Sequence, residues 1–173
     1  MSAERDAFTW EDLGDIEAGR PNLGGTTSVI AFRLFHFATR FVLEEKLGVG
    51  ETDRLLRRAG HLAGREFAAT QLDRGCDLTA YLEAVQRKMA ELRIGVLNVE
   101  REDRGRMELT LTISEDLDCS GVPVQGRTIC TFDEGFIAGI FERYADLEFA
   151  VKEIDCWAAG AKLCRFTIRP VRR

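Results

Sequence analysis

The sequence predicts an α+β fold in which an antiparallel β-sheet carries its helices mainly on one face. Three stretches with helical spacing of apolar residues come first, and two stretches with strand-like alternation follow them. A fourth helix and two further strands complete the order, and such runs of helices and of strands favour an antiparallel sheet over a parallel one. The elements are expected at residues 28–48, 51–73, 78–92, 93–103, 106–116, 133–145, 148–156 and 163–170.

The first helix carries apolar residues on more than one side. Ser28, or Thr26 or Thr27 before it, can cap its first turn. Phe32 and Phe35 lie off its main apolar face, as expected for a helix that packs both on the domain and on a partner or ligand. A well-buried core helix would show the same pattern, so both interpretations stay open. The main face consists of Ile30, Leu34, Phe37 and Phe41.

The second helix contains two glycines four residues apart. Gly60 and Gly64 fall on one face, where small residues allow another backbone to approach closely. Inside a helix each glycine costs about 1 kcal/mol relative to alanine, so close packing is the expected reason for their presence. The residues expected on the buried side of this helix are Leu55, Ala59, Leu62 and Phe67.

Local signals also define the third helix and the hairpin that follows it. Asp77 can cap the helix, and Leu82, Val85 and Met89 form its buried face. The Arg-Gly pair at 104–105 marks the turn between two strand-like stretches, which predicts an antiparallel hairpin. Along the second strand, one side is expected to carry Met107, Leu109, Leu111 and Ile113.

Length and charge bound the domain organisation and the class of protein. The 173 residues suffice for one domain at 26–173, preceded by an arm at 1–25 that is expected to contact a second subunit. A net charge of −5 without a basic cluster argues against nucleic-acid binding. Charged residues interrupt the apolar runs, so no membrane span is expected. The acidic N-terminus lacks the pattern of a signal peptide, which predicts a cytoplasmic protein.

Three cysteines and a glutamate in the last third of the chain form a candidate metal site. Cys130, Cys156 and Cys164, with Glu153, supply the sulfur and oxygen ligands that zinc accepts in a tetrahedron. Spacing alone leaves two alternatives, because the cysteines can equally be ordinary buried thiols, or Cys156 and Cys164 can form a disulfide across a hairpin. The other two cysteines, Cys76 and Cys119, fall outside this pattern and are expected to be incidental.

The same stretch resembles the end of a 4-vinyl reductase domain, a family that includes the zinc-containing sensor domains of phenol- and xylene-responsive activators. The resemblance rests on a glycine-rich helix at 135–141, an E-x-x-C motif at 153–156, Gly160 in a turn, and C-x-F at 164–166. Zinc-bearing members space their ligands by 23, 3 and 8 residues, as this chain spaces its own candidates. The resemblance therefore implies a structural zinc on Cys130, Glu153, Cys156 and Cys164. It also implies the ligand-binding fold shared with vesicle-tethering complex subunits.

The resemblance further implies an apolar pocket between the sheet and the helices. Residues near the positions that hold the hydroxyl in phenol sensors are Tyr81 and Leu109 here, which favours a more apolar ligand than phenol. A plain hydrophobic core would contain the same side chains, so a filled core stays an alternative. The expected lining consists of Tyr81, Met107, Leu109, Leu111, Ile140 and Val151.

The sequence favours binding over catalysis. It contains no phosphate-binding glycine loop, nucleophile elbow or zinc-protease motif, and no catalytic residue is assigned. We expect a stand-alone sensor or carrier for a small hydrophobic or aromatic molecule, acting as a homodimer and passing its signal to a protein effector. The alternatives are an accessory role in tetrapyrrole or bacteriochlorophyll metabolism, which the family name implies, and a ligand-free assembly module.

Overall fold

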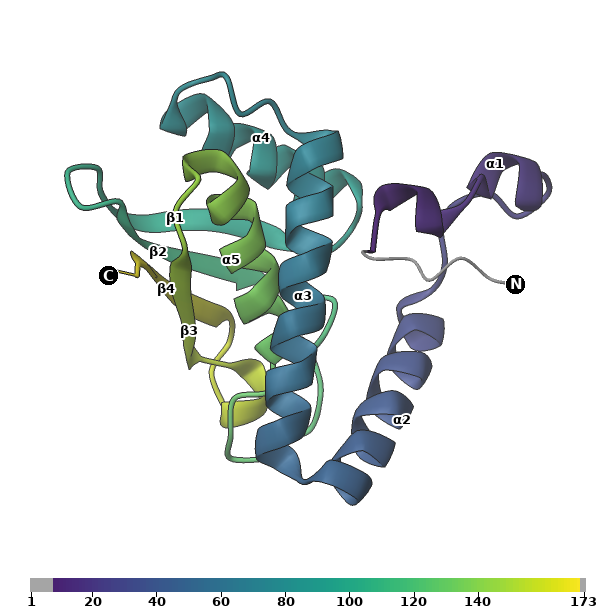
Figure 1. The fold of residues 1–173 in the computed structure, drawn as a ribbon. Coiled ribbons are helices and arrows are strands. Elements are labelled where there is room, and N and C mark those ends of the chain that lie inside the picture. The colour runs from purple at the N-terminus through teal and green to yellow at the C-terminus, as the bar shows by residue number, and fades with distance from the viewer. Residues whose placement is uncertain (1–7, 172–173) are drawn as a thin grey trace.

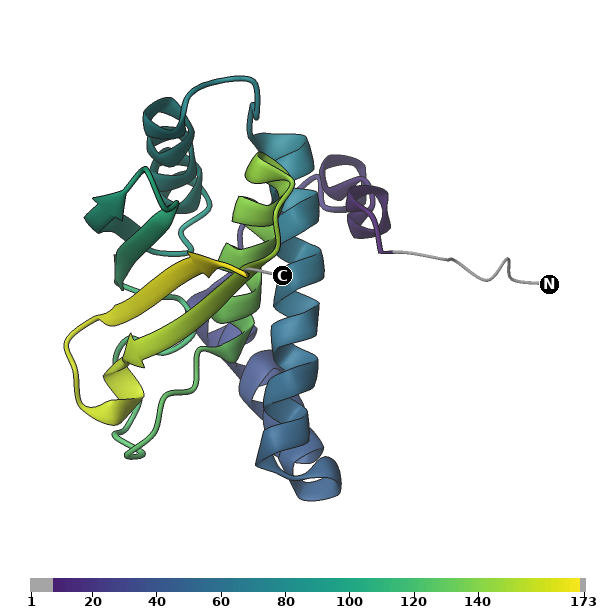
Figure 2. The same cartoon turned by 60° about the vertical axis from the view of Figure 1, so that its left-hand side comes forward.

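A computed structural model describes residues 8–171 and consists of an antiparallel sheet with helices layered on one face (Figures 1 and 2). Helices α4 and α5 pack on the sheet, and the long helix α3 packs on the outer side of α5. The expected fold class and the order of the helices and strands from residue 28 onward are confirmed. The helices and strands are η1 Trp10–Leu13, α1 Ile16–Gly19, α2 Val29–Leu47, α3 Val49–Gln71, α4 Leu78–Glu91, β1 Val96–Asp103, β2 Glu108–Ser114, α5 Thr131–Ala145, β3 Phe149–Asp155, η2 Trp157–Ala159 and β4 Cys164–Pro170.

The sheet has the strand order β1-β2-β4-β3, and each neighbouring pair is antiparallel. The predicted hairpin is present, since Leu97 of β1 faces Ile113 of β2. On β2 the alternation holds from Leu109 to Ile113, but Met107 precedes the strand and is only half-buried. Met107 has a φ of 53°, so it belongs to the turn rather than to the inward face of the strand.

The helix starts lie where the capping residues predict them. Ser28 accepts a hydrogen bond from the amide of Ala31 at 3.2 Å, and Asp77 accepts one from Ala80 at 3.0 Å. Helix α3 starts at Val49, two residues earlier than expected, because Gly48 alone separates it from α2.

Helices α3 and α5 cross at their glycines. A Cβ atom on Gly60 would lie closer than 3.0 Å to the carbonyl oxygen of Phe132, and one on Gly135 would meet the carbonyl oxygen of Arg57 equally closely. The close approach expected at Gly60 and Gly64 is therefore confirmed, with α5 as the partner. The expected buried face of α3 is wrong at Ala59, which is exposed, because the glycines and Phe67 face α5 instead.

Helix α2 is turned with its polar side towards the domain. Within α2, which the structure describes in full, Arg40 alone is buried, and Phe37 is the member of the predicted apolar face that packs on the core. The expectation of a largely buried apolar face is therefore wrong for Ile30, Leu34 and Phe41, which are 73%, 69% and 69% exposed. Figure 1 shows α2 standing away from the sheet and touching the body near the start of α3.

The N-terminal arm docks on α3. Trp10 is half-buried, and its amide donates a hydrogen bond to the Glu66 carboxylate at 3.1 Å. Part of the predicted arm, residues 1–7, lies outside the described residues. Within residues 8–171, no helix is both long and apolar enough to cross a membrane.

Candidate metal centre

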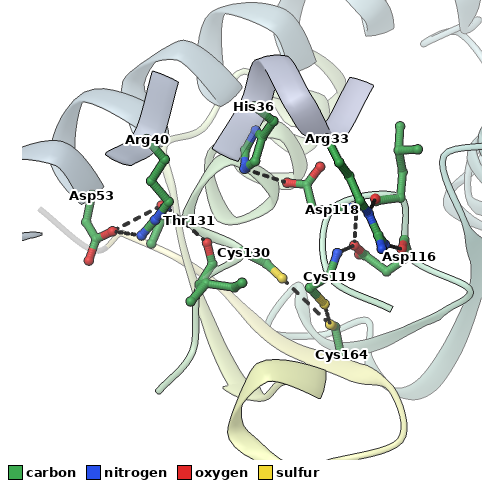
Figure 3. Close-up of polar contacts among 12 residues, drawn as sticks. Arg33, His36, Arg40, Asp53, Asp116, Asp118, Cys119, Cys130, Thr131 and Cys164 are labelled. Carbon is green, nitrogen blue, oxygen red and sulfur yellow. Dashed lines mark hydrogen bonds and ion pairs between the residues drawn. The ribbon is translucent and has the colours of Figure 1, made fainter. Parts of the chain in front are cut away.

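Four buried cysteines from four segments of the chain meet at one end of the sheet. Cys119 lies in the loop after β2, Cys130 precedes α5, Cys156 follows β3 and Cys164 begins β4. Their sulfur atoms all lie within 4.8 Å of one another, and each side chain is fully buried. Figure 3 shows Cys119, Cys130 and Cys164 converging. This buried cluster of four thiols can bind a metal ion.

The sulfur separations suit a tetrahedral ion. The Cys130 Sγ lies 3.8 Å from the Sγ atoms of both Cys156 and Cys164, and Cys119 Sγ lies 3.1 Å from that of Cys164. Zinc–sulfur bonds of about 2.3 Å place tetrahedral sulfurs roughly 3.8 Å apart. All five cysteines of the chain are free thiols, so the alternative of a disulfide between Cys156 and Cys164 is not adopted.

Tight turns bring the last two cysteines together. After Cys156 the chain folds back, and the amides of Ala159 and Ala161 donate to the Cys156 carbonyl oxygen at 2.9 and 3.0 Å. Gly160 has a φ of 100°, a conformation that favours glycine, and it allows the return into β4. The glycine in the E-x-x-C to C-x-F segment thus positions Cys156 beside Cys164.

Sequence analysis missed Cys119. Asp116 accepts hydrogen bonds from the amides of Asp118 and Cys119 at 2.8 and 3.0 Å, which forms a local turn that holds Cys119. The signal that could have found it is this Asp-x-x-Cys pattern, in a loop that leads to Cys130. Cys119 is therefore part of the cluster rather than incidental, whereas Cys76 lies outside it.

Glu153 lies beside the thiols but outside the group whose ligand atoms all approach one another. Its Oε2 accepts a hydrogen bond from the amide of Cys130 at 3.1 Å, and the side chain is 2% exposed. Burial raises the pKa of Glu153 to about 8. The structure thus brings together three of the predicted ligands, and it places the fourth against the backbone of one of them.

Hydrogen bonding among the thiols distributes their protons unevenly. Contact with Cys119 is the largest cause that raises the pKa of Cys130 and of Cys164, and also the largest that lowers the pKa of Cys156. Cys156 is therefore the thiol most ready to act as a thiolate, the form that binds metals.

Three further acids are buried next to the cysteines. Asp116, Asp118 and Asp133 are 3%, 6% and 7% exposed. Burial, followed by the charge of Asp118, raises the pKa of Asp116 to about 7. Burial raises the pKa of Asp118 to about 6, and it raises that of Asp133 well above its usual value. A concentration of buried carboxyl groups beside four thiols marks this region as the polar centre of the molecule.

The polar side of α2 is attached to the two segments that carry Cys119 and Cys130 (Figure 3). Arg33 donates hydrogen bonds to the carbonyl oxygens of Leu117 and Ser120 at 2.8 and 2.9 Å. Arg40 donates to the carbonyl oxygen of Ile129 at 3.3 Å and forms an ion pair with Asp53. The arginines explain why α2 presents its polar side to the body.

The predicted pocket residues lie together in the core between the sheet and helices α4 and α5. Tyr81 is fully buried, and its hydroxyl donates to the carbonyl oxygen of Ile140 at 2.9 Å. Leu109, Leu111 and Ile140 are also buried, whereas Met107 and Val151 are half-buried at the margin. A cavity of about 660 Å³ lies elsewhere, between α3, α5 and the start of β3, and polar residues such as Arg57 and Glu142 line it.

Sequence comparisons place the cysteine cluster in a known domain. The family model of the 4-vinyl reductase domain matches residues 109–170. An uncharacterized protein of Methanocaldococcus jannaschii is 24% identical over 159 residues, which cover 92% of this chain and 87% of the relative. A second protein from that organism, also uncharacterized, is 34% identical over 73 residues, or 39% of this chain and 45% of the relative.

Solved structures share the fold at low sequence identity. The phenol-responsive sensory domain of the transcription activator PoxR, determined with phenol, has a TM-score of 0.66 at 17% identity, over 83% of this chain and 75% of that chain. A vinyl-4-reductase family protein from M. jannaschii has a TM-score of 0.64 at 14% identity, over 99% and 100% of the two chains. A trafficking protein particle complex subunit 3 from Naegleria fowleri, covalently bound to palmitic acid, has a TM-score of 0.66 at 14% identity, over 83% and 95%.

These findings confirm the resemblance to the 4-vinyl reductase domain family and the expected likeness to a vesicle-tethering subunit at the level of the fold. The matched segment contains all four clustered cysteines as well as Glu153. The chain has the fold of 4-vinyl reductase domain proteins, and residues 109–170 are the part of it that the family model matches.

Proposed function

We propose that this protein is a binding module for a small hydrophobic molecule, acting as a sensor or carrier and stabilised by a structural zinc ion. The observation that carries the proposal is the shared fold with two proteins that hold mainly apolar molecules. One of these proteins was determined with phenol and the other with covalently bound palmitic acid. Their common fold places a buried apolar layer between the sheet and the helices, where this chain has its own core.

In this proposal Cys119, Cys130, Cys156 and Cys164 hold the zinc ion. Four thiolates complete a tetrahedron, and a closed site of this kind is structural rather than catalytic. The ion would tie the loop after β2 and the start of α5 to strands β3 and β4. The set predicted from the sequence, with Glu153 as the fourth ligand, stays the alternative, and Cys119 is favoured because its sulfur lies among the other three.

The proposed ligand site lies around Tyr81, Leu109, Leu111 and Ile140, with Met107 and Val151 at its margin. These side chains come from α4, β2, α5 and the β3 region, so a ligand among them would contact both layers of the fold. They are closely packed, with Tyr81 fully buried and Leu111 and Ile140 each 1% exposed. A bound molecule must therefore displace side chains, which favours a small, flexible or slowly exchanging ligand.

Leu109→Trp is expected to prevent ligand binding while leaving the protein folded. The larger side chain would occupy the space between the sheet and the helices, at an overpacking cost of about 1–3 kcal/mol. Native mass spectrometry of protein purified without refolding, with phenol or palmitate added, measures the bound mass. Val96→Trp, at an exposed position on β1, is the matched control and should bind as the wild type does.

Binding by wild type and by Val96→Trp, with loss in Leu109→Trp, would support the site. Equal binding by Leu109→Trp would place the ligand elsewhere. No organic mass on the wild type, with or without the probes, would favour a ligand-free assembly module instead. The filled core around Tyr81 is the observation that favours this second function.

We further propose that α2 pairs with α2 of a second copy. Its outward face carries contiguous exposed apolar side chains, whereas its arginine side is already attached to the body. Such an unpartnered apolar face typically marks a protein interface. An isologous pair would bury the same patch on both copies. The exposed residues are Ile30, Leu34, Phe35, Phe41 and Val42.

Leu34→Glu is expected to convert the dimer into a monomer. The change places a charge in the centre of an apolar interface, where burial of an unpaired carboxylate is strongly unfavourable. Analytical ultracentrifugation measures the change. Leu92→Glu, at an exposed position after α4, serves as the control and should remain dimeric. A wild type that is monomeric throughout the micromolar range would refute the proposed pairing.

A further inference from the structure

We propose that Asp116 and Asp133 form a second divalent-cation site next to the four thiols, with Cys130 as a ligand shared between the two sites. The inference rests on the proposed metal at the thiol cluster. It assigns a role to buried acids that the structural zinc does not use.

The three ligand groups come together without any rearrangement. A carboxylate oxygen of Asp116, the Cys130 sulfur and a carboxylate oxygen of Asp133 all lie within 4.8 Å of one another, and all three residues are buried. Cys130 belongs both to this group and to the group of four thiols. Asp133 lies in the first turn of α5, three residues after Cys130, so the helix start positions both side chains.

The Asp133 carboxylate supplies an independent sign of a missing cation. Its Oδ2 is buried and accepts no hydrogen bond within the described residues, although the residue is only 7% exposed. A buried ionised carboxylate without a partner is strongly unfavourable, so such groups are normally paired or bound to a metal. Oδ2 of Asp118 and Oε1 of Glu153 are likewise buried and unpartnered among residues 8–171.

The nearby cations are already committed to other groups. Arg33 donates to the carbonyl oxygens of Asp116, Leu117 and Ser120. The bonds of Arg40 go to Ile129, Thr131, Glu44 and Asp53. His36 lies 4.0 Å from Asp118 rather than beside Asp133. The charge of Asp133 is therefore left for a group that is not a side chain of residues 8–171.

The donor set defines the class of ion. Two carboxylate oxygens and one thiolate bring three negative charges, and this mixture suits zinc or another divalent transition ion better than calcium, which prefers oxygen ligands alone. A site with three protein ligands leaves a position for water, unlike the closed thiolate site. The two ions would share Cys130, so the second would add to the order of the first.

The test counts metal ions per chain in protein purified without chelator and then saturated with zinc alone. Native mass spectrometry should find two ions on the wild type and one on Asp133→Asn. The amide has the shape of the carboxylate but removes its charge. Asp146→Asn, at an exposed position at the end of α5, is the matched control and should keep two ions.

The melting temperature gives a second readout with opposite signs for the two possibilities. With a bound cation, Asp133→Asn should lower the melting temperature of the zinc-saturated protein. Without one, the same change should raise it, because it removes an unpaired buried charge.

One ion on the wild type, or two ions on Asp133→Asn, would overturn the second site while leaving the thiolate zinc intact. No ion on the wild type would overturn both sites, so the two proposals fail in distinguishable ways. The count on the wild type decides the matter even if Asp133→Asn does not fold.

Discussion

Cys156→Ser will lose the metal of the thiol cluster and unfold the C-terminal lobe. Cys156 joins β3 to the turn that returns into β4, and its sulfur lies 3.8 Å from that of Cys130 at the start of α5. Structural zinc contributes about 10–16 kcal/mol of binding free energy in zinc-finger peptides, and small domains are stable by only about 5–15 kcal/mol. We therefore expect loss of the cooperative thermal transition, or a large fall in its midpoint.

Metal content by mass spectrometry and thermal unfolding by circular dichroism measure this outcome. Cys76→Ser is the control, because Cys76 is half-buried outside the cluster and its thiol donates to the Asp73 carbonyl oxygen at 3.0 Å. It should keep its metal and change stability little. A metal-free Cys156→Ser protein that melts at the wild-type temperature would refute the structural role of the ion.

The same experiment identifies the fourth ligand. If Cys119 binds the metal, Cys119→Ser should weaken zinc binding strongly, whereas Glu153→Gln should keep the zinc, since the amide oxygen can still accept the Cys130 amide proton. The reverse result would establish the set with Glu153. With cobalt in place of zinc, sulfur-to-metal absorbance should fall in Cys119→Ser only if its thiolate is a ligand.

Gly135→Ala is expected to destabilise the protein by about 3 kcal/mol, near the upper end of typical overpacking costs. The new Cβ would lie closer than 3.0 Å to the backbone of Arg57 and His61 on α3. A backbone clash cannot be relieved by a change of rotamer, so α3 and α5 would have to separate. Separation would also weaken the bonds of the buried Glu134 to Arg57 and Lys152, at 2.9 Å each.

Gly50→Ala is the matched control, since it lies in α3 with no atom within 4 Å of its added Cβ. There alanine should stabilise the helix by up to about 1 kcal/mol. Urea unfolding followed by circular dichroism compares the two variants. Equal stability of Gly135→Ala and Gly50→Ala would mean that the helices do not cross as closely as the structure shows.

The sequence by itself determined the features that depend on neighbours along the chain. Ser28 and Asp77 start helices because their side chains bond to amides three residues later, and alternation from Leu109 to Ile113 defines one face of a strand. Gly60 and Gly64 predicted a close helix contact because a stripe of small residues has few other uses in a helix. The relation of Cys130, Cys156 and Cys164 also follows a linear spacing, and their convergence was predicted.

Only the tertiary structure decided which segments far apart in sequence come together. Cys119 joins the cluster because the loop after β2 folds back on the start of α5, and no periodic pattern reports such a path. Helix α2 turns its apolar side outward because Arg33 and Arg40 bond to the carbonyl oxygens of that loop and of the segment before α5. An amphipathic pattern states that two faces differ. Which face the domain covers is set by the groups that it offers, and here they are polar.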